Sequence, residues 1–327
     1  MYKLDDATRE YFQEPLFFAD AFNFHIFGGE QVLRADALEP LPESVTAGRD
    51  ASRRRDLLKR AVFRCQDGVT YALLGIENQA APDHIMALRG LMYDVLSYDS
   101  QFREVADRNR RENRPGRDFL TDLCPDDCVA PVVTQVIYWS HQPWTAPRRL
   151  HELLHFQDPR LKAFTADYRL NLLEPYKVAE DDFAKFHTTL GDMLHYVKVR
   201  SKWRAALDFV ESSALFRNLD RLSLNLLCAL FPKKAQEILQ KHISDLKPTK
   251  EGGIDMVTTV KSITDLWREQ GYEEGREEGR EEERAEGAQR MARLLQNTGL
   301  PQGNVVSMLC QGFSLTEEQA RGYLAQV

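Results

Sequence analysis

The chain contains few cysteines, and their distribution argues against two classes of protein. Five cysteines occur among 327 residues, an odd number scattered along the chain, which is not the pattern of a small disulfide-stapled domain. Cys124 and Cys128 are four residues apart but have no second pair and no nearby histidines, so they do not complete a zinc site. We therefore expect the fold to depend on an ordinary hydrophobic core.

Targeting and membrane signals are also missing. The first residues, Met1 to Asp6, lack the basic and then apolar pattern of a signal peptide. No stretch approaches the roughly 18 consecutive apolar residues of a membrane-spanning helix. The sequence therefore predicts a cytoplasmic protein that has no membrane partner.

The chain lacks a positive net charge, which at first argues against binding to nucleic acid. The formal net charge is −7, but residues 268–287 hold nine Glu and four Arg. The remainder is therefore close to neutral and has room for local basic patches. Two such patches are Arg53, Arg54, Arg55, Lys59 and Arg60, and then Arg103, Arg108, Arg110, Arg111, Arg114 and Arg117. Basic loops suit a phosphate backbone, although a solvated surface explains each patch equally well.

The most informative local pattern is a predicted β-hairpin. Asp67-Gly68 separates two apolar runs, residues 57–64 and 70–76, and Asp-Gly favours a two-residue type I′ turn. If this pair forms the turn, the numbers of opposing residues sum to 135. Asp56 then faces Gln79, and Leu58 faces Glu77.

This hairpin would place two carboxylates and an amide on one face of the sheet. Side chains alternate with period two, so Asp56, Glu77 and Gln79 share a face. Asp56 and Glu77 form a diagonal pair roughly 7–8 Å apart. Glu77 ends a nearly continuous apolar run, where a carboxylate is costly unless it is paired, protonated or bound to metal. A divalent cation is the expected partner, and a solvated pair of acids is the alternative.

A helix should follow the hairpin. Pro82 and Asp83 suit a helix N-terminus. Arg89 lies one to two turns further on, where it could reach the metal site or a phosphate, although a solvated Arg89 is the simpler alternative. Residues 129–138 then read as another buried strand. The expected core-facing stripe of this helix is Ile85, Leu88, Met92, Val95 and Leu96.

Several short segments follow one another in a specific order. They are residues 20–27, residues 54–58, residues 76–79, Met86 to Arg89 leading to Tyr93, and residues 136–138 leading to Pro143-Trp144. A glycine-and-charge repeat then precedes a short helical C-terminus. In these features, which extend over most of its length, the chain resembles the bacterial recombination-promoting nuclease/putative transposase family of the PD-(D/E)xK nuclease superfamily.

The resemblance implies an α/β fold, with a restriction-endonuclease-like core of a central mixed sheet flanked by helices, followed by an α-helical region. It also implies divalent-metal dependence and cleavage of DNA phosphodiester bonds. Asp56 resembles the first metal-binding acid and Glu77 the second, while Asp20 resembles the acid on the preceding helix. Gln79 stands where the superfamily usually has lysine. Glutamine can orient water or phosphate only through hydrogen bonds, so Arg89 is a candidate for the missing positive charge.

A competing motif lies at His151-Glu152-Leu153-Leu154-His155. On an α-helix, HExxH places two histidines on one face to bind zinc, with the glutamate activating water, and Glu174 follows at a distance suitable for a third ligand. The leucines of the same segment also make an amphipathic helix that needs no metal. A zinc protease is therefore the less favoured alternative.

The rest of the chain shows no chemistry. We expect a nuclease-like core over residues 1–158, a helical subdomain over 159–247, a linker and Glu/Gly/Arg-rich spacer helix over 248–287, and a small helical element over 288–327. The helical subdomain is inferred from apolar spacings that begin at Leu170, Leu172 and Leu173. The last element reads as two short helices, residues 301–310 and 315–326, that could bind DNA, a partner or a second copy of the chain.

The sequence thus predicts a Mg²⁺- or Mn²⁺-dependent DNA endonuclease with Asp56 and Glu77 as metal ligands. Gln79 and Asp20 would assist, and Arg89 would contact phosphate. A catalytically inactive DNA-binding module is the principal alternative, because Gln79 replaces the usual lysine.

Overall fold

The computed structural model describes residues 3–41, 56–65, 68–201, 218–231 and 302–313, together with residues 209, 236, 291, 315 and 320. The chain divides into two compact units, residues 1–261 and 262–327, and each is described by itself.

The first unit is a mixed α/β structure built on a five-stranded sheet with the strand order β1-β2-β3-β4-β5. The first three strands are antiparallel neighbours, whereas β4 runs parallel to β3 and β5 runs parallel to β4. The expected mixed sheet flanked by helices is therefore confirmed at this level. The strands are β1 (Leu38–Pro40), β2 (Leu57–Cys65), β3 (Gly68–Gln79), β4 (Val132–Tyr138) and β5 (Asn171–Leu173).

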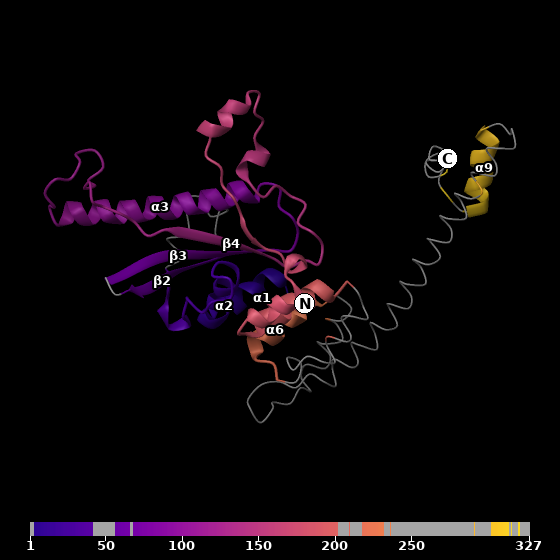
Figure 1. The fold of residues 1–327 in the computed structure, drawn as a ribbon, viewed down its shortest axis with the longest axis horizontal. Coiled ribbons are helices and arrows are strands. Elements are labelled where there is room, and N and C mark those ends of the chain that lie inside the picture. The colour runs from indigo at the N-terminus through magenta and orange to yellow at the C-terminus, as the bar shows by residue number, and fades with distance from the viewer. Residues whose placement is uncertain are drawn as a thin grey trace. The chain divides into compact units, whose positions relative to one another are not determined.

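Helices lie on both sides of this sheet. Figure 1 shows the long helix α3 along one side of the strands and helices α1, α2 and α6 on the other. The α-helices of the unit are α1 (Leu4–Gln13), α2 (Pro15–His25), α3 (Met86–Arg111), α4 (Thr189–Val199) and α6 (Arg221–Leu230). Short 3₁₀ turns are η1 (Ala35–Ala37), η3 (Leu150–Leu153), η4 (Pro159–Phe164), η5 (Pro175–Lys177) and η6 (Glu180–Lys185).

The helix pair at the N-terminus follows from local chemistry. Asp5 and Asp6 lie in the first turn of α1, where negative charge interacts favourably with the positive end of the helix dipole. Pro15 occupies the start of α2 and Glu14 before it is extended, with φ −66° and ψ 120°, because proline disfavours a helical residue at the preceding position. One apolar segment thereby becomes two helices.

The central strand β3 positions the rest of the unit. It lies between β2 and β4, and its residues from 72 to 78 are all buried, as expected for a strand covered on both faces. A parallel connection from β3 to β4 needs a crossover, and α3 supplies it. Gln79 at the end of β3 therefore lies close in sequence to the start of the crossover helix.

Two sequence-based assignments differ from the structure. The helix α3 begins at Met86, because Asp83 accepts a hydrogen bond from the Ile85 N–H, 3.0 Å away, in a turn before the helix. Residues 171–173 are strand β5 at the edge of the sheet and not part of a helix. The expectation of a helical subdomain from about residue 160 was therefore wrong up to Thr188, and regular α-helix resumes with α4.

The second unit contains helix α9 (Gln302–Phe313), which confirms the first of the two predicted C-terminal helices. Its buried face consists of Val305, Val306 and Leu309, which pack with Ala320. The Glu/Gly/Arg-rich spacer and most of the second predicted helix lie outside the described residues. Across the described part of both units, no helix has the length and apolar character needed to cross a membrane.

A buried lysine ties β2 to the N-terminal helices. Lys59 is 6% exposed, its Nζ donates to the Gln13 carbonyl oxygen at 2.7 Å, and it lies over the Phe18 ring. Gln13 ends α1, where a positive charge interacts favourably with the helix dipole. Burial nevertheless lowers the pKa of Lys59 from 10.5 to about 8, although the charge of Glu14 opposes this shift.

This lowered pKa predicts an alkaline gain in stability. Below pH 8 Lys59 is charged in both the folded and the unfolded protein, so the folded protein bears the full cost of burying that charge. As pH rises toward 10.5 the folded state releases its proton first, so the free energy of unfolding should increase. A pKa difference of about 2.5 corresponds to at most about 3 kcal/mol. Urea unfolding between pH 7 and 10 should show this increase in the wild type and not in Lys59→Met.

Lys185→Met is the matched control, because Lys185 is half exposed in an ion pair with Asp182. It should retain the wild-type pH dependence. Identical pH dependence in Lys59→Met and the wild type would contradict the assignment.

Candidate functional site

The β2–β3 hairpin forms as expected, but its register differs by two residues. Leu57 pairs with Ile76 and Cys65 pairs with Gly68, so opposing numbers sum to 133, and Gly68 belongs to β3. The predicted Asp67-Gly68 turn was therefore wrong. A shift of two residues leaves every side chain on its original face, so the hydrophobic pattern is satisfied equally by both registers.

The observed register brings Asp56 and Glu77 closer than predicted. It places them directly opposite each other, one pair beyond the last paired residues of β2 and β3. The Asp56 N–H donates to Glu77 Oε1 at 3.1 Å, and the Asn78 N–H donates to Asp56 Oδ2 at 2.8 Å. Each carboxylate is thus held by the backbone of the neighbouring strand. Asp56 and Glu77 form the centre of the candidate site.

A cavity of about 730 Å³ opens beside this pair, at the carboxyl end of β3. Ligands of open α/β sheets usually bind at the carboxyl ends of strands. The cavity is bounded by the first helix, the end of the hairpin and the turn before α3. Its lining residues are Asp5, Asp6, Arg9, Asp56, Asn78, Gln79, Ala80, Ala81, Pro82, Asp83, His84 and Arg89.

Glu77 lies behind the cavity wall and is fully buried, at 0% exposure. Arg89 compensates part of its charge, since a guanidinium nitrogen lies 3.6 Å from Glu77 Oε2. The same guanidinium donates to Asp83 Oδ2 at 2.6 Å and to the Tyr93 hydroxyl at 3.2 Å. Arg89 therefore connects the buried acid to the cavity, and it is not the solvated side chain that the sequence left as the alternative.

The protonation of Asp56 and Arg89 reflects this environment. Burial raises the pKa of Asp56, while the hydrogen bond from Asn78 and the charge of Arg9 act in the opposite direction. Burial alone would lower the pKa of Arg89. Its hydrogen bonds with Tyr93 and Asp83 outweigh burial, however, and raise that pKa above its ordinary value. The site thus combines a permanent cation with a carboxyl group whose charge is made costly by burial.

Gln79 lies where the sequence placed it. It ends β3, pairs in register with Tyr138 of β4, and lines the cavity. Its neighbour Asn78 points to the other side of the strand and accepts a hydrogen bond from the Trp139 indole at 2.9 Å. Gln79 is therefore a cavity residue, whereas the Asn78 side chain anchors the strand.

Asp20 does not line the cavity. It lies on α2, is buried, and accepts hydrogen bonds from the N–H groups of His187 and Thr188 at 3.0 Å and from the Thr188 hydroxyl at 2.6 Å. Thr188 is the N-cap of α4, so these bonds fasten α2 to the start of α4. The contacts of Asp20 are those of a structural residue.

The first helix instead contributes residues that the sequence reasoning did not consider. Asp5, Asp6 and Arg9 of α1 line the cavity, and the charges of Asp5 and Arg9 act on Asp56. Two acids and a basic residue on neighbouring positions of one helical turn were visible in the sequence. These residues are far from the hairpin in sequence, however, and no local pattern predicts that they contact it.

The donor chemistry of the site suits a divalent cation. Mg²⁺ is commonly bound by one or two carboxylates, with water and substrate phosphate completing its octahedron. Asp56 Oδ1 accepts no hydrogen bond from any described residue, and Glu77 lies next to it. Within the described ranges, no group of three or more His, Cys, Asp or Glu side chains is arranged to hold a metal. If a divalent cation binds at this site, Asp56 and Glu77 are the carboxylates that would hold it, with water and substrate completing its coordination.

The HExxH segment does not form the expected helix. Residues 150–153 make a short 3₁₀ turn, which does not place residues 151 and 155 on one face. His151 Nε2 donates to the Thr165 carbonyl oxygen at 2.9 Å, and Glu152 accepts from the Arg148 N–H at 2.7 Å. Glu174 is buried and forms ion pairs with Arg148 and Lys177. The geometry required for a zinc protease is absent from this segment.

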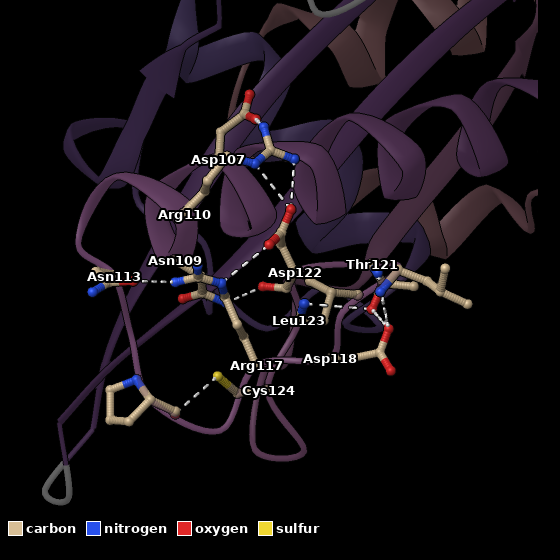
Figure 2. Close-up of polar contacts among 12 residues, drawn as sticks. Asp107, Asn109, Arg110, Asn113, Arg117, Asp118, Thr121, Asp122, Leu123 and Cys124 are labelled. Atoms are coloured by element: carbon tan, nitrogen blue, oxygen red, sulfur yellow. Dashed lines mark hydrogen bonds and ion pairs between the residues drawn. The ribbon is translucent and has the colours of Figure 1, made fainter.

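The second basic patch does not line the cavity. It lies at the far end of α3, which at 26 residues is about 39 Å long. Figure 2 shows two of its arginines bound to an acid of the following loop: Asp122 accepts from Arg110 at 2.6 Å and lies 3.2 Å from Arg117. Arg114 likewise pairs with Asp126 and Asp127. These ion pairs fold the loop onto α3.

The first basic patch is only partly described. Arg53, Arg54 and Arg55 lie outside the described residues. Lys59 is buried beneath α1, and Arg60 lies 3.8 Å from Glu39.

Comparison with known proteins adds no relatives. The chain matches no protein-family model, and neither the curated proteins nor the solved structures contain a match to it.

The contact between Glu77 and Arg89 should be measurable in stability. Arg89→Met removes a cation from a fully buried acid. Breaking a buried pair typically costs 3–5 kcal/mol. The 3.6 Å separation and the 33% exposure of Arg89 reduce the expected cost to about 2 kcal/mol. Urea unfolding of the wild type, Arg89→Met, Glu77→Gln and the double variant forms the required cycle.

The cost of Arg89→Met should fall when Glu77 is already Gln, because the buried charge is then gone. An equal cost in both backgrounds would show that Arg89 acts only through Asp83 and Tyr93.

Proposed function

We propose that this protein is a metal-dependent DNA endonuclease of the PD-(D/E)xK type. The observation that carries the proposal is the Asp56–Glu77 pair at the edge of a cavity, where the Asp56 N–H donates to Glu77 and the Asn78 N–H donates to Asp56. The mixed sheet with a crossover helix is compatible with such a core. The resemblance of the sequence motifs supplies the reaction class.

The residues divide into clear roles under this proposal. Asp56 and Glu77 would hold Mg²⁺ or Mn²⁺, which supplies an activated water and neutralises charge on the phosphate. Gln79 has an amide that can donate to a phosphate oxygen or accept from water. Arg89 would add a fixed positive charge to phosphate binding, because its guanidinium lines the same cavity. Asp20 would act indirectly, by fixing α2 to α4.

The nuclease proposal predicts metal-dependent nicking of supercoiled plasmid. The wild type should nick with Mg²⁺ or Mn²⁺ and not with EDTA. Asp56→Asn and Glu77→Gln should each lower the rate at least about 100-fold, the scale of a lost electrostatic contribution to a transition state. Asp182→Asn is the matched control, because Asp182 is a partly exposed acid paired with Lys185, and it should retain full activity.

Titration of the wild type and Asp56→Asn with Mn²⁺ by calorimetry separates loss of metal from loss of chemistry. Equal nicking by wild type and both variants would indicate a contaminating nuclease and contradict the assignment. No nicking by any of them would favour the inactive module.

One observation favours that second function, a DNA-binding module without catalysis. The Glu77 carboxylate already lies next to the Arg89 cation, and the residue at position 79 is glutamine. In this case DNA binding should persist in EDTA and in Asp56→Asn, measured by fluorescence anisotropy with a labelled duplex.

Arg89 provides a further test of the catalytic reading. Arg89→Ala should lower the nicking rate about 10- to 100-fold, because a charge-assisted contact to phosphate is lost. Arg89→Lys should recover part of this loss. Arg108→Ala is the control, since Arg108 is an exposed arginine on the same helix near its other end. Unchanged nicking by folded Arg89→Ala would remove Arg89 from the proposed machinery.

A further inference from the structure

The cavity at the end of β3 is lined by two arginines that differ in how far their charge is already used. Arg89 donates to Asp83 at 2.6 Å and to the Tyr93 hydroxyl at 3.2 Å. It also lies 3.6 Å from the buried Glu77. The guanidinium of Arg9, in contrast, forms no hydrogen bond or ion pair with any residue that the structure describes. Arg9 is therefore the arginine of this cavity whose donors remain available to a ligand.

Arg9 lacks an ion pair although an acid stands at a suitable position on its own helix. Asp5 precedes Arg9 by four residues on α1, the spacing and order that favour an ion pair. On α3, Arg103 has the same spacing from Asp99 and pairs with it at 2.9 Å. Asp5 and Arg9 do not form such a pair, and both line the cavity. The charge of Arg9 is thus not used to stabilise α1.

Arg9 also lies near the first of the two central carboxylates. Burial raises the pKa of Asp56, and the charge of Arg9 opposes that rise, so the two groups are within range of each other's charge. They come from different walls of the cavity, because Arg9 lies on α1 and Asp56 directly precedes β2. A substrate group bound beside Asp56 would therefore also meet Arg9.

The position of Arg89 is fixed by the packing of α3. The next residue, Gly90, lies so close to the Tyr168 ring that a Cβ would be 2.9 Å from it. One turn further on, Asp94 accepts a hydrogen bond from the Tyr168 hydroxyl at 2.7 Å. This packing keeps Arg89 beside the buried Glu77. It also turns outward part of the stripe that the sequence pattern had assigned to the core, and that assignment was wrong for Ile85, Leu88 and Val95, which are exposed.

We propose that Arg9 binds a backbone phosphate of the cleaved DNA strand, next to the phosphate that Arg89 contacts. The assignment rests on the proposed function, because it takes DNA as the substrate. Two arginines on different walls of one cavity can hold two successive phosphates of a strand. A guanidinium suits this role, since it presents several N–H donors to phosphate oxygens and stays charged. Arg9 then contributes to binding, whereas Arg89 acts at the bond that is cleaved.

The acids around Arg9 determine when a phosphate can bind. Four aspartates line the cavity together with Arg9 and Arg89, namely Asp5, Asp6, Asp56 and Asp83. Carboxylates therefore outnumber guanidinium groups, and a phosphate is repelled unless a divalent cation offsets part of the negative charge. DNA binding should accordingly require a divalent cation, and the contribution of Arg9 should be measured in its presence.

Fluorescence anisotropy with a labelled duplex in Ca²⁺ tests this contact. Ca²⁺ also binds oxygen ligands, and it replaces Mg²⁺ so that binding is measured without turnover. Arg9→Gln should raise Kd about 10-fold, the effect of one charge-assisted contact. It should also make the plot of log Kd against log KCl concentration shallower by up to about 0.9, because one phosphate contact fewer releases fewer counterions. Arg9→Lys keeps the charge and should retain most of the slope.

Arg108→Gln is the matched control for the change in net charge. Arg108 is exposed on α3, forms no ion pair with a described residue and does not line the cavity. Its variant should keep the wild-type Kd and slope. An Arg9→Gln protein that matches the wild type in both quantities overturns the proposal, and so does a wild type that binds no duplex in Ca²⁺.

Plasmid nicking with Mg²⁺ locates the contact along the strand. Arg9→Gln should raise KM about 10-fold and leave kcat within about twofold, as expected when a ground-state contact is lost. A fall in kcat at unchanged KM would place Arg9 at the cleaved bond and overturn its assignment to a neighbouring phosphate.

The two assays separate this assignment from the nuclease proposal. A wild type that nicks, with Kd and KM unchanged in Arg9→Gln, overturns the role of Arg9 alone. A wild type that does not nick, but whose binding of duplex weakens in Arg9→Gln with a shallower salt dependence, contradicts the nuclease proposal and supports the phosphate contact of Arg9.

Discussion

The structure of the site depends on one buried charge. Glu77 ends the central strand β3 with no exposed surface, a position that is strongly unfavourable for a carboxylate without compensation. The Asp56 N–H and the Arg89 guanidinium supply that compensation from opposite directions. The start of β2 and the first turns of α3 must therefore both approach the end of β3, and the cavity is the space left between them.

This constraint also explains the arrangement of the first helix. Lys59 lies on the opposite face of β2 and donates to the last carbonyl of α1, which fixes α1 against the hairpin. The other end of α1 then brings Asp5, Asp6 and Arg9 to the cavity. Asp20, in contrast, uses its carboxylate to join α2 to α4. Of the two N-terminal helices, α1 thus supplies the polar groups of the site and α2 supplies a structural joint.

The features that could be predicted from the sequence were those determined by local periodicity. Alternation placed Asp56, Glu77 and Gln79 correctly on one edge of the hairpin, because period two is insensitive to a register shift of two residues. The same insensitivity is why the register itself was missed. Residues 170–173 were misread because a short apolar segment fits a helix or a strand, and only the free edge of β4 makes it a strand.

The site residues contributed by the first helix could not be predicted, because they depend on contacts between distant segments. Nothing in the local sequence distinguishes Asp20 from Asp5 or Asp6, since each is an acid on an N-terminal helix. Their roles differ because the start of α1 lies at the cavity, whereas Asp20 on α2 faces α4. The pairing of the arginines at the C-terminal end of α3 and in the loop after it was missed in the same way. A count of charges does not show that Arg110, Arg114 and Arg117 are already paired with acids of the loop that follows.

Helix α3 shows where a correct pattern leads to a wrong assignment. The heptad spacing from Ile85 to Val95 is a genuine signal for helix packing, but periodicity does not identify the neighbour. The sheet instead meets the face that carries Gly90, Asp94 and Ser97, where a small residue allows close approach and hydrogen bonds satisfy the buried acid. An apolar stripe that the core does not use remains an unmet packing requirement. The packing of Gly90 and Asp94 fixes the rotation of α3, and it thereby holds Arg89, one position before Gly90, beside the buried Glu77.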